Sequence, residues 1–498
     1  AAHQGNAAAA LAMGDTYYQG LGVEVDFVKA REWYERAAEG EDPRGLVALA
    51  HMMRAGEGGE ANLEKSAKLF LRAAARNEVR ALYQVGMMFL TGQGLTQDFD
   101  KAETYLRRSA RQDFHPAVLA LAEFYARGDG VQPDLREAAL WYQKAADLGN
   151  VQAQFFTGRF YATGTGVSPN VKEAARWFLK AAEQGHETAA YNAAILHLNG
   201  TGVDRDKAKA VEWFEKAAAA GLSAAQIQLG RLYSAGDGVP KDTKRAAEWL
   251  EKAASSGDVE AKIALAMFYL QDDPTPTNIA RGKSLLEAVA EAGHAAAAKF
   301  LGDAWTGKYG GAANAAEALR WYRRSAEAGF TEAQHILGAL CLRKVGNKDE
   351  AATAVAWFEK AAQSDHAPSQ FQLAVMYCTG HGVPLDLSRG FAWYEQAAQL
   401  GHTLAQYNVA VMLGQGQGCE RNPKNALMWF EKAARQGLAA AQFAMGEACE
   451  SGRDIERDLA AAREWYEAAA RQGNEAAQRK LQAVVTEGAK GAENIPRC

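Results

Sequence analysis

Twelve side chains of this 498-residue sequence have the chemistry to bind another protein, and they recur at three positions of a 36-residue period. An aromatic ring can bury an apolar side chain of a partner, an amide can hydrogen-bond a peptide backbone, and a guanidinium can pair with a carboxylate. The first position is held by Tyr83, Phe155, Tyr191, His335, Phe371 and Tyr407, the second by Phe156, Asn192, Gln228 and Asn408, and the third by Arg159 and Arg231.

The other residue types that carry chemistry form no catalytic or metal-binding pattern in the sequence. The histidines are scattered, and no nucleophile or carboxylate accompanies them at a recurring spacing. Glycine pairs such as Gly164-Thr165-Gly166 resemble part of a phosphate-binding loop, but they recur in most copies of the period and lack the Lys-Ser/Thr that such a loop requires. The sequence therefore predicts no enzyme, no metal site and no cofactor.

Charge and cysteine content exclude further classes of function. The formal net charge is −5 and the charges of both signs are interspersed, so we expect no nucleic-acid partner. No apolar run reaches the length of a membrane span. The five cysteines are odd in number, no two share a copy of the period, and none has zinc-site spacing. Cys341 and Cys449 occupy the buried aromatic position of the first helix, so we interpret them as small buried thiols. A bridge between Cys341 and Cys378 stays open as an alternative.

One copy of the period, residues 221–256, shows which elements must position these side chains. Apolar residues recur at intervals of three and four in each half, which predicts two helices with one apolar stripe each. Two glycines and a proline interrupt the pattern between them and predict a turn. The stripes consist of Ala225, Leu229, Leu232 and Tyr233 in the first helix, and of Ala246, Trp249, Leu250 and Ala253 in the second.

This unit recurs thirteen times without drift in its period. The residue after the first-helix leucine is always glycine or alanine, which allows the two helices of a unit to approach closely. A single helix pair cannot bury both of its stripes, whereas stacked pairs bury them continuously. The sequence therefore predicts an all-α solenoid of about thirteen 36-residue helix-turn-helix units. The Trp249 position is occupied in order by Trp33, Leu69, Tyr105, Trp141, Trp177, Trp213, Trp249, Leu285, Trp321, Trp357, Trp393, Trp429 and Trp465.

The consensus of the units resembles the Sel1-like repeat, a relative of the tetratricopeptide repeat. The resemblance covers the chain from about Gly5 to Gly473. It implies a right-handed superhelix whose first helices line a concave face and whose second helices lie outside. The twelve candidate residues would then lie on the concave face, although the first of their three positions could instead pack against the neighbouring first helix. The motif residues include Ala225-Gln226, Leu229-Gly230, Tyr233, Gly236, Gly238-Val239, Trp249 and Lys252-Ala253-Ala254.

We expect three segments: a repeat solenoid over residues 1–473, a polar capping helix over residues 474–487, and a loose tail over residues 488–498. The stretch 270–350 departs from the consensus in its turns. This departure is either drift in loops, which tolerate change, or a bend or partner-specific contact.

The family resemblance favours an interaction scaffold or adaptor that binds one or more partner proteins on the concave face. The alternative is an immunity protein or inhibitor that wraps and blocks a toxin enzyme. An enzyme is disfavoured, because the paired cysteines of the cysteine-rich relatives described as β-lactamases and an acid–base constellation are both absent. The chain begins at Ala1 and many bacterial relatives are exported, so a periplasmic or secreted location is favoured over a cytoplasmic one.

Overall fold

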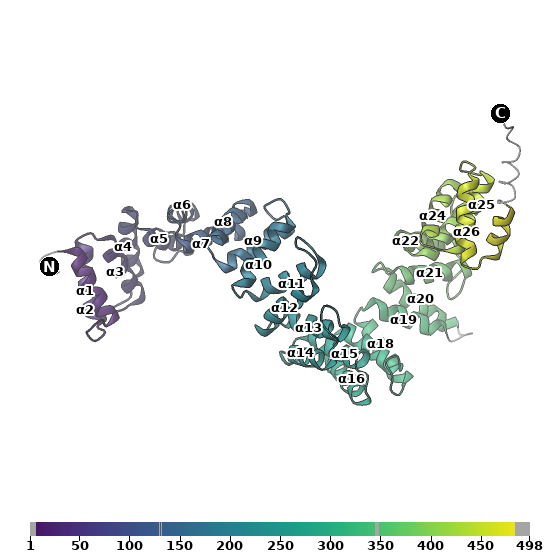
Figure 1. Cartoon of the computed structure of the whole chain (residues 1–498), viewed down its shortest axis with the longest axis horizontal. Helices are drawn as coiled ribbons and strands as arrows, with labels where there is room; N and C mark the ends of the chain where they lie inside the picture. Colours follow the sequence, from purple (N-terminus) through teal and green to yellow (C-terminus); the bar gives the residue numbers. More distant parts are fainter. Residues whose placement is uncertain (1–5, 129, 131, 344–347, 484–498) are drawn as a thin grey trace. The chain divides into compact units, whose positions relative to one another are not determined.

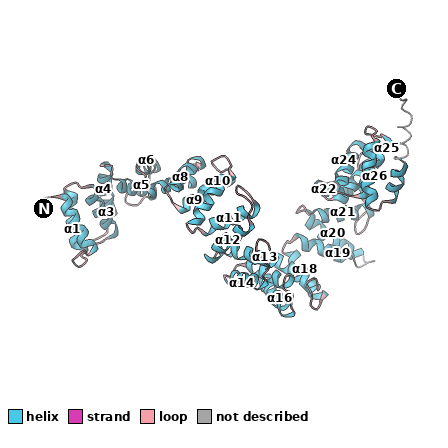
Figure 2. Ribbon diagram, viewed as in Figure 1, coloured by secondary structure: helices cyan, strands magenta, loops and turns pink. Residues whose placement is uncertain are grey.

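The computed structural model describes residues 6–128, 130, 132–343 and 348–483, and within these residues every regular element is a helix (Figures 1 and 2). The chain divides into two compact units, Ala1–Ala261 and Lys262–Cys498, and the boundary falls inside helix α15 (Val259–Gln271). The predicted α-solenoid is confirmed, because helices alternate in pairs along the chain at the predicted repeat length.

The first unit, described here from residue 6, contains fourteen complete helices. The odd-numbered helices are the first helices of the repeats and the even-numbered helices are the second. Their bounds are α1 (Ala7–Gln19), α2 (Phe27–Glu39), α3 (Pro43–Ala55), α4 (Leu63–Ala75), α5 (Val79–Thr91), α6 (Phe99–Ala110), α7 (His115–Arg127), α8 (Leu135–Asp147), α9 (Val151–Thr163), α10 (Val171–Glu183), α11 (Glu187–Asn199), α12 (Lys207–Ala219), α13 (Ser223–Ala235) and α14 (Thr243–Ser255).

The second unit continues the same alternation as far as its residues are described. After α15, its labelled helices are α16 (Pro276–Glu291), α17 (Ala295–Trp305), α18 (Ala315–Glu327), α19 (Thr331–Leu342), α20 (Lys348–Ala362), α21 (Ala367–Thr379), α22 (Leu387–Gln399), α23 (Thr403–Gln415), α24 (Pro423–Arg435), α25 (Ala439–Ser451) and α26 (Leu459–Arg471).

The turn between the helices of one repeat explains the G-x-G motif. In the fifth repeat, Gly164 ends α9 in the left-handed conformation with φ 72°, and its N–H donates to the carbonyl of Phe160. Gly166 also has a positive φ, of 70°, and a Cβ there would lie 2.0 Å from the carbonyl oxygen of Leu135 in the preceding repeat. Asn170 then caps α10 with its side chain. The glycines are therefore structural, and the second allows adjacent repeats to approach.

The last repeat and the chain after it show how the pattern ends. Asp454, which replaces the second turn glycine, adopts the left-handed conformation itself, with φ 65°. Residues 475–483 are helical, and Ala477 is fully buried against the last repeat. The remainder of the predicted capping helix, residues 484–487, and the predicted tail, residues 488–498, lie outside the described residues.

Packing inside each repeat depends on the small residue of the first helix. A Cβ on Gly230 would lie 2.4 Å from Cγ of Leu250, so this glycine lets α13 and α14 pack closely, as the sequence predicts. Burial at the tryptophan position of the second helix differs between repeats, since Trp177 and Trp321 are fully buried. Phe214 is fully buried, whereas Trp213 is half-buried and lies beneath the ammonium of Lys216, 3.8 Å from the ring centroid. The sequence-based expectation that Trp213 fills a buried aromatic site is therefore wrong.

A buried glutamine connects successive repeats. Nε2 of Gln226 in α13 donates to the carbonyl oxygen of Ala218 in α12 over 3.0 Å, and Gln154, Gln334, Gln370, Gln406 and Gln442 make the equivalent bond. The carbonyl of Ala218 also accepts from the N–H of Gly221 at 3.1 Å, so the glutamine adds a second hydrogen bond to a carbonyl at the C-terminus of the preceding helix. It gives a physical reason for the Ala-Gln pair of the consensus.

In the irregular stretch of the second unit, the turn after α17 is held by one buried carboxylate. Asp303 accepts hydrogen bonds from the hydroxyl of Tyr322 at 2.7 Å and from Nζ of Lys308 at 3.1 Å, and it pairs with Nζ of Lys299 at 3.2 Å. The side chain of Asp303 is 6% exposed. The turn residues Lys308 and Tyr309 therefore fold back onto their own repeat.

Candidate functional site

The aromatic residues at the first candidate position take part in packing. The Phe155 ring lies 5.9 Å from the Phe178 ring of the second helix and 4.5 Å from the His186 imidazole, on which it stacks. Phe371 repeats this arrangement with Tyr394 at 5.5 Å and His402 at 4.5 Å. The position thus packs on the second helix of its own repeat and on the residue before the next first helix. This packing explains its apolar character without requiring a ligand.

The third candidate position places one guanidinium beside a cavity. In the first unit, Arg159 is exposed, and its Cζ lies 5.9 Å from the Phe155 ring centroid and 5.8 Å from that of Phe156. Across the described part of the chain, no acidic or hydrogen-bonding partner is found for this guanidinium. The adjacent cavity has a volume of about 170 Å³ and is lined by Ala126, Tyr142, Phe156, Arg159, Phe160, Thr163 and Thr165.

Two hydroxyl groups that line this cavity, those of Thr163 and Thr165, already donate hydrogen bonds within the chain. Oγ1 of Thr163 donates to the carbonyl oxygen of Arg159 over 3.0 Å, and the two threonine hydroxyls lie 2.6 Å apart. Because Thr163 uses its proton on that carbonyl, Thr165 donates to Thr163. Thr165 therefore keeps lone pairs that can accept a hydrogen bond. The cavity combines an apolar wall, one cation and one acceptor.

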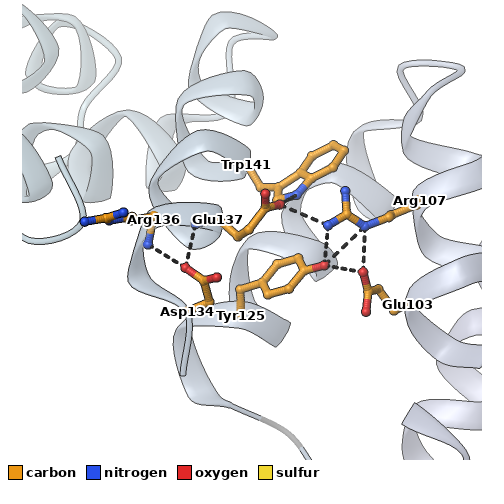
Figure 3. Close-up of polar contacts among 7 residues, drawn as sticks. All are labelled: Glu103, Arg107, Tyr125, Asp134, Arg136, Glu137 and Trp141. Atoms are coloured by element: carbon orange, nitrogen blue, oxygen red, sulfur yellow. Dashed lines mark hydrogen bonds and ion pairs between the residues drawn. The ribbon is translucent and has the colours of Figure 1, made fainter. Parts of the chain in front are cut away.

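Arg107, on α6 of the same unit, differs from Arg159 because its guanidinium is hydrogen-bonded to neighbouring side chains (Figure 3). Its guanidinium donates to Glu103 at 2.7 Å, to the hydroxyl of Tyr125 at 2.6 Å and to Glu137 at 3.0 Å, across three helices. Glu137 also accepts from the indole N–H of Trp141 at 3.1 Å. This network connects the third and fourth repeats, and in it one guanidinium faces two carboxylates. We assign it a structural role and regard Arg159 as the available cation.

The remaining candidate residues of the first unit are dispersed over its first helices. Tyr191, Asn192 and Gln228 are half-buried, and Tyr191 packs on Phe214 at 5.5 Å. Arg231 is exposed. It lies two repeats from Arg159, on α13 rather than α9.

In the second unit, Tyr407 and Asn408 lie on α23 and are half-buried. Tyr407 packs on Phe430 at 5.6 Å. Burial raises the pKa of Tyr394 to about 12, although a hydrogen bond from Asn408 opposes the shift. These polar side chains are thus partly engaged within their own repeats.

A second cavity of about 290 Å³ occupies the equivalent place two repeats before the first one. Tyr83 and Gln84 line it together with Arg54, whose Nη1 donates to Oε1 of Gln84 over 2.9 Å. Sequence reasoning missed Arg54, and it also missed Tyr142 and Thr165 at the first cavity. The three residues occupy different positions of the repeat, and the residues 72 positions away from them are Ala126, Phe70 and Gln93, so no recurring sequence signal marks them.

His335 belongs to a buried polar junction in the second unit. Its Nδ1 lies 2.9 Å from Oγ of Ser369, which is fully buried and also lies 2.8 Å from Nδ1 of His366. Burial lowers the pKa of His335 to about 4, and the charge of His366 adds to this. Burial also lowers the pKa of His366, against the opposing charge of Glu332. The junction therefore requires neutral imidazoles to connect α19 with α21.

We expect the second unit to lose stability in mild acid because of this junction. The stabilisation is complete above the ordinary histidine value near 6.5, and it is lost as the pH falls toward about 4, because the unfolded chain then binds the proton more readily. Thermal unfolding of wild type and His335→Phe between pH 7 and pH 4.5 tests this. Phenylalanine occupies the equivalent position at Phe371, so the variant should show a shallower pH dependence. Parallel curves would contradict the prediction.

No helix among the described residues is long and apolar enough to cross a membrane. The described ranges also contain no group of three or more His, Cys, Asp or Glu side chains placed to hold a metal ion, and Cys378, Cys419 and Cys449 are free thiols. The bridge between Cys341 and Cys378 is therefore not formed.

The fold defines a helical repeat protein. The model of the Sel1 repeat matches this chain thirteen times, so the chain belongs to the Sel1 repeat family. The matched residues are 7–42, 43–78, 79–114, 115–150, 151–186, 188–222, 223–258, 259–294, 295–330, 331–366, 367–402, 403–438 and 439–474.

Several solved structures are similar to the chain. A protective antigen of uropathogenic Escherichia coli strains with an SLR fold is 32% identical, with 84% of this chain and 90% of that chain covered and a TM-score of 0.49. A Sel1 repeat protein from Oxalobacter formigenes is 27% identical, with coverage of 72% and 91% and a TM-score of 0.46. An immunity protein from Pseudomonas aeruginosa is 19% identical, with coverage of 44% and 82% and a TM-score of 0.29. No curated protein matches the chain.

Proposed function

We propose that this protein is an interaction scaffold that binds a partner protein on the first-helix surface of its first unit, around Arg159. The main observation behind this proposal is the exposed guanidinium of Arg159. It lies over two phenylalanine rings beside a cavity and has no acidic or hydrogen-bonding partner among the described residues. Aromatic and arginine side chains at partly desolvated sites supply much of the energy of protein interfaces. An unpaired arginine adds selectivity for an acidic group.

Family membership supports this class of function, because Sel1 repeat proteins are generally interaction scaffolds. It does not identify a partner. An inhibitor that wraps a toxin enzyme is the second candidate from the sequence, but the likeness to the Pseudomonas aeruginosa immunity protein is too low to support it. The scaffold is therefore the function we propose.

We expect Arg159→Glu to weaken partner binding at least tenfold with little change in the melting temperature, because it reverses an exposed charge whose contacts among the described residues are limited to the Phe155 and Phe156 rings. The partner is first isolated by affinity capture from cells that express the protein, and its dissociation constant is then measured with purified variants. Combining Arg159→Glu with Arg231→Glu should weaken binding further if the partner spans two repeats. Arg136→Glu, which reverses an exposed charge on a second helix, is the matched control.

Equal affinity of Arg159→Glu and wild type would refute this binding surface. A loss of affinity in Arg136→Glu alone would place the partner on the second-helix side instead. The captured material also separates the two candidate functions: several subunits of one assembly support the scaffold, whereas one enzyme bound at equal stoichiometry and inactivated supports the inhibitor.

A further inference from the structure

We infer that the cavity beside Arg159 binds the C-terminal residue of a partner chain, when that residue has an apolar side chain. This inference deepens the proposed function and rests on it, since it names the chemistry that the binding surface recognises. Three properties of the cavity support terminal-residue binding: its size and lining, its unpaired cation, and its hydrogen-bond acceptor.

The size of the cavity limits its occupant. A volume of about 170 Å³ is below the roughly 300–1,000 Å³ of sites that enclose drug-sized ligands, so it suits one side chain. Tyr142, Phe156 and Phe160 form the wall, and the Tyr142 ring lies 5.0 Å from Phe156 and 5.6 Å from Phe160. Aromatic rings at these separations form an apolar surface that favours an aliphatic or aromatic side chain.

The charge at the cavity requires an anion close to that side chain. Arg159 lines the cavity, and no acidic or hydrogen-bonding partner is found for its guanidinium among the described residues. The neighbouring acid Glu123, on α7, is paired with Arg127 at 2.7 Å, so it does not neutralise Arg159. A guanidinium binds a carboxylate through two parallel hydrogen bonds.

The third property of the cavity is its hydrogen-bond acceptor. Thr165 Oγ1 donates its proton to Thr163, and its remaining lone pairs can accept from an N–H group. A C-terminal residue carries a carboxylate, an N–H and a side chain on one Cα atom. It therefore offers the three complementary groups within the span of one residue. An internal acidic residue presents its carboxylate on the side chain and leaves the apolar wall to a neighbour.

The cavity at Arg54, two repeats earlier, differs from the cavity at Arg159 in its charged group. This difference supports binding of a C-terminal residue at Arg159 alone. In the earlier cavity the guanidinium is engaged by Gln84 at 2.9 Å, and the lining contains Met87 and Met88 in place of Arg159 and Phe160. Arg54 donates one of its N–H groups to Gln84, and the residue equivalent to Arg159 in this cavity is the uncharged Met87. We therefore expect terminal-residue binding at Arg159 and not at Arg54.

N-Acetyl-4-fluoro-L-phenylalanine is the probe for this inference, and its binding to the full-length protein is followed by ¹⁹F NMR. The free acid should bind saturably, and the corresponding amide at least tenfold more weakly, because the amide lacks the charge. Arg159→Gln should remove the difference between acid and amide, whereas Arg54→Gln should leave it unchanged. Thr165→Val, which removes the acceptor at nearly constant shape, should weaken the acid several-fold.

Equal binding of acid and amide to the wild type would overturn the inference, and so would an acid preference that survives in Arg159→Gln. Tighter binding of N-acetyl-phenylalanyl-glutamate amide than of the free acid would overturn the terminal carboxylate in favour of an internal acid. The probe needs no natural partner, so the two proposals fail separately. If Arg159→Glu weakens the captured partner while the probe shows no acid preference, only this inference is lost.

Discussion

Phe214→Ala is expected to lower the free energy of unfolding of the first unit by about 3–5 kcal/mol, because it removes a fully buried ring and leaves a cavity. Phe214 is the residue after the tryptophan position in α12, and it packs on Tyr191 of α11. Alanine at this site removes the ring contact between the two helices of one repeat. Denaturant unfolding followed by circular dichroism measures the loss, and hydrogen exchange should locate it in α11–α13.

Trp213→Ala is the matched control for Phe214→Ala, one residue away on the same helix. It should cost only about 1–2 kcal/mol, because the indole is already half-exposed and contributes partial burial and a cation–π contact with Lys216. The pair compares rings of similar chemistry that differ in burial. An equal or larger loss in Trp213→Ala would contradict the assignment of the core position of this repeat to Phe214.

Asp303→Ala should destabilise the second unit by about 3–5 kcal/mol, because it removes the acid from a buried pair and leaves Lys299 and Tyr322 without it. The Lys299 side chain is 13% exposed and pairs otherwise only with the exposed Glu332 among the described residues. The measurement is denaturant unfolding at pH 7, with hydrogen exchange of α17 and α18 to locate the change.

Asp15→Ala is the control for this change, since Asp15 occupies the same repeat position and accepts from Tyr34 at 2.8 Å. We expect a loss of about 1 kcal/mol there, as for a single hydrogen bond. A loss at Asp303 no larger than at Asp15 would show that the two lysines add nothing to the stability of the turn.

The stability that Asp303 contributes also depends on pH. The direction of this dependence follows from the groups around the Asp303 carboxylate. Burial alone would raise the pKa of Asp303, but hydrogen bonds from Tyr322 and Lys308 and the charge of Lys299 hold it below its ordinary value of 3.8. The contribution is thus complete above this unfolded-state value and is lost as the pH falls through the lower folded-state value. Wild type should therefore lose more stability than Asp303→Ala in this acidic range.

The sequence by itself predicted the repeat and its local structure. The period of 36 residues, the two apolar stripes and the glycine pair were sufficient for helix pairs, turns and an α-solenoid. These features depend on contacts within a few residues, such as the Gly164 N–H with Phe160, and on a stripe that each helix repeats along its length. Sequence reasoning also selected Phe155, Phe156 and Arg159 by subtracting the buried stripe.

Only the tertiary structure decided which side chains are available. Trp213 and Phe214 both belong to the apolar stripe, and their burial differs because Tyr191 covers one ring and Lys216 the other. Arg107 and Arg159 are both arginines on helix surfaces, yet one meets Glu137 thirty residues away and the other has no such partner among the described residues. These contacts join different repeats, so the pattern within one repeat cannot predict them. Availability for binding depends on three-dimensional neighbours, whereas helix formation depends on neighbours along the chain.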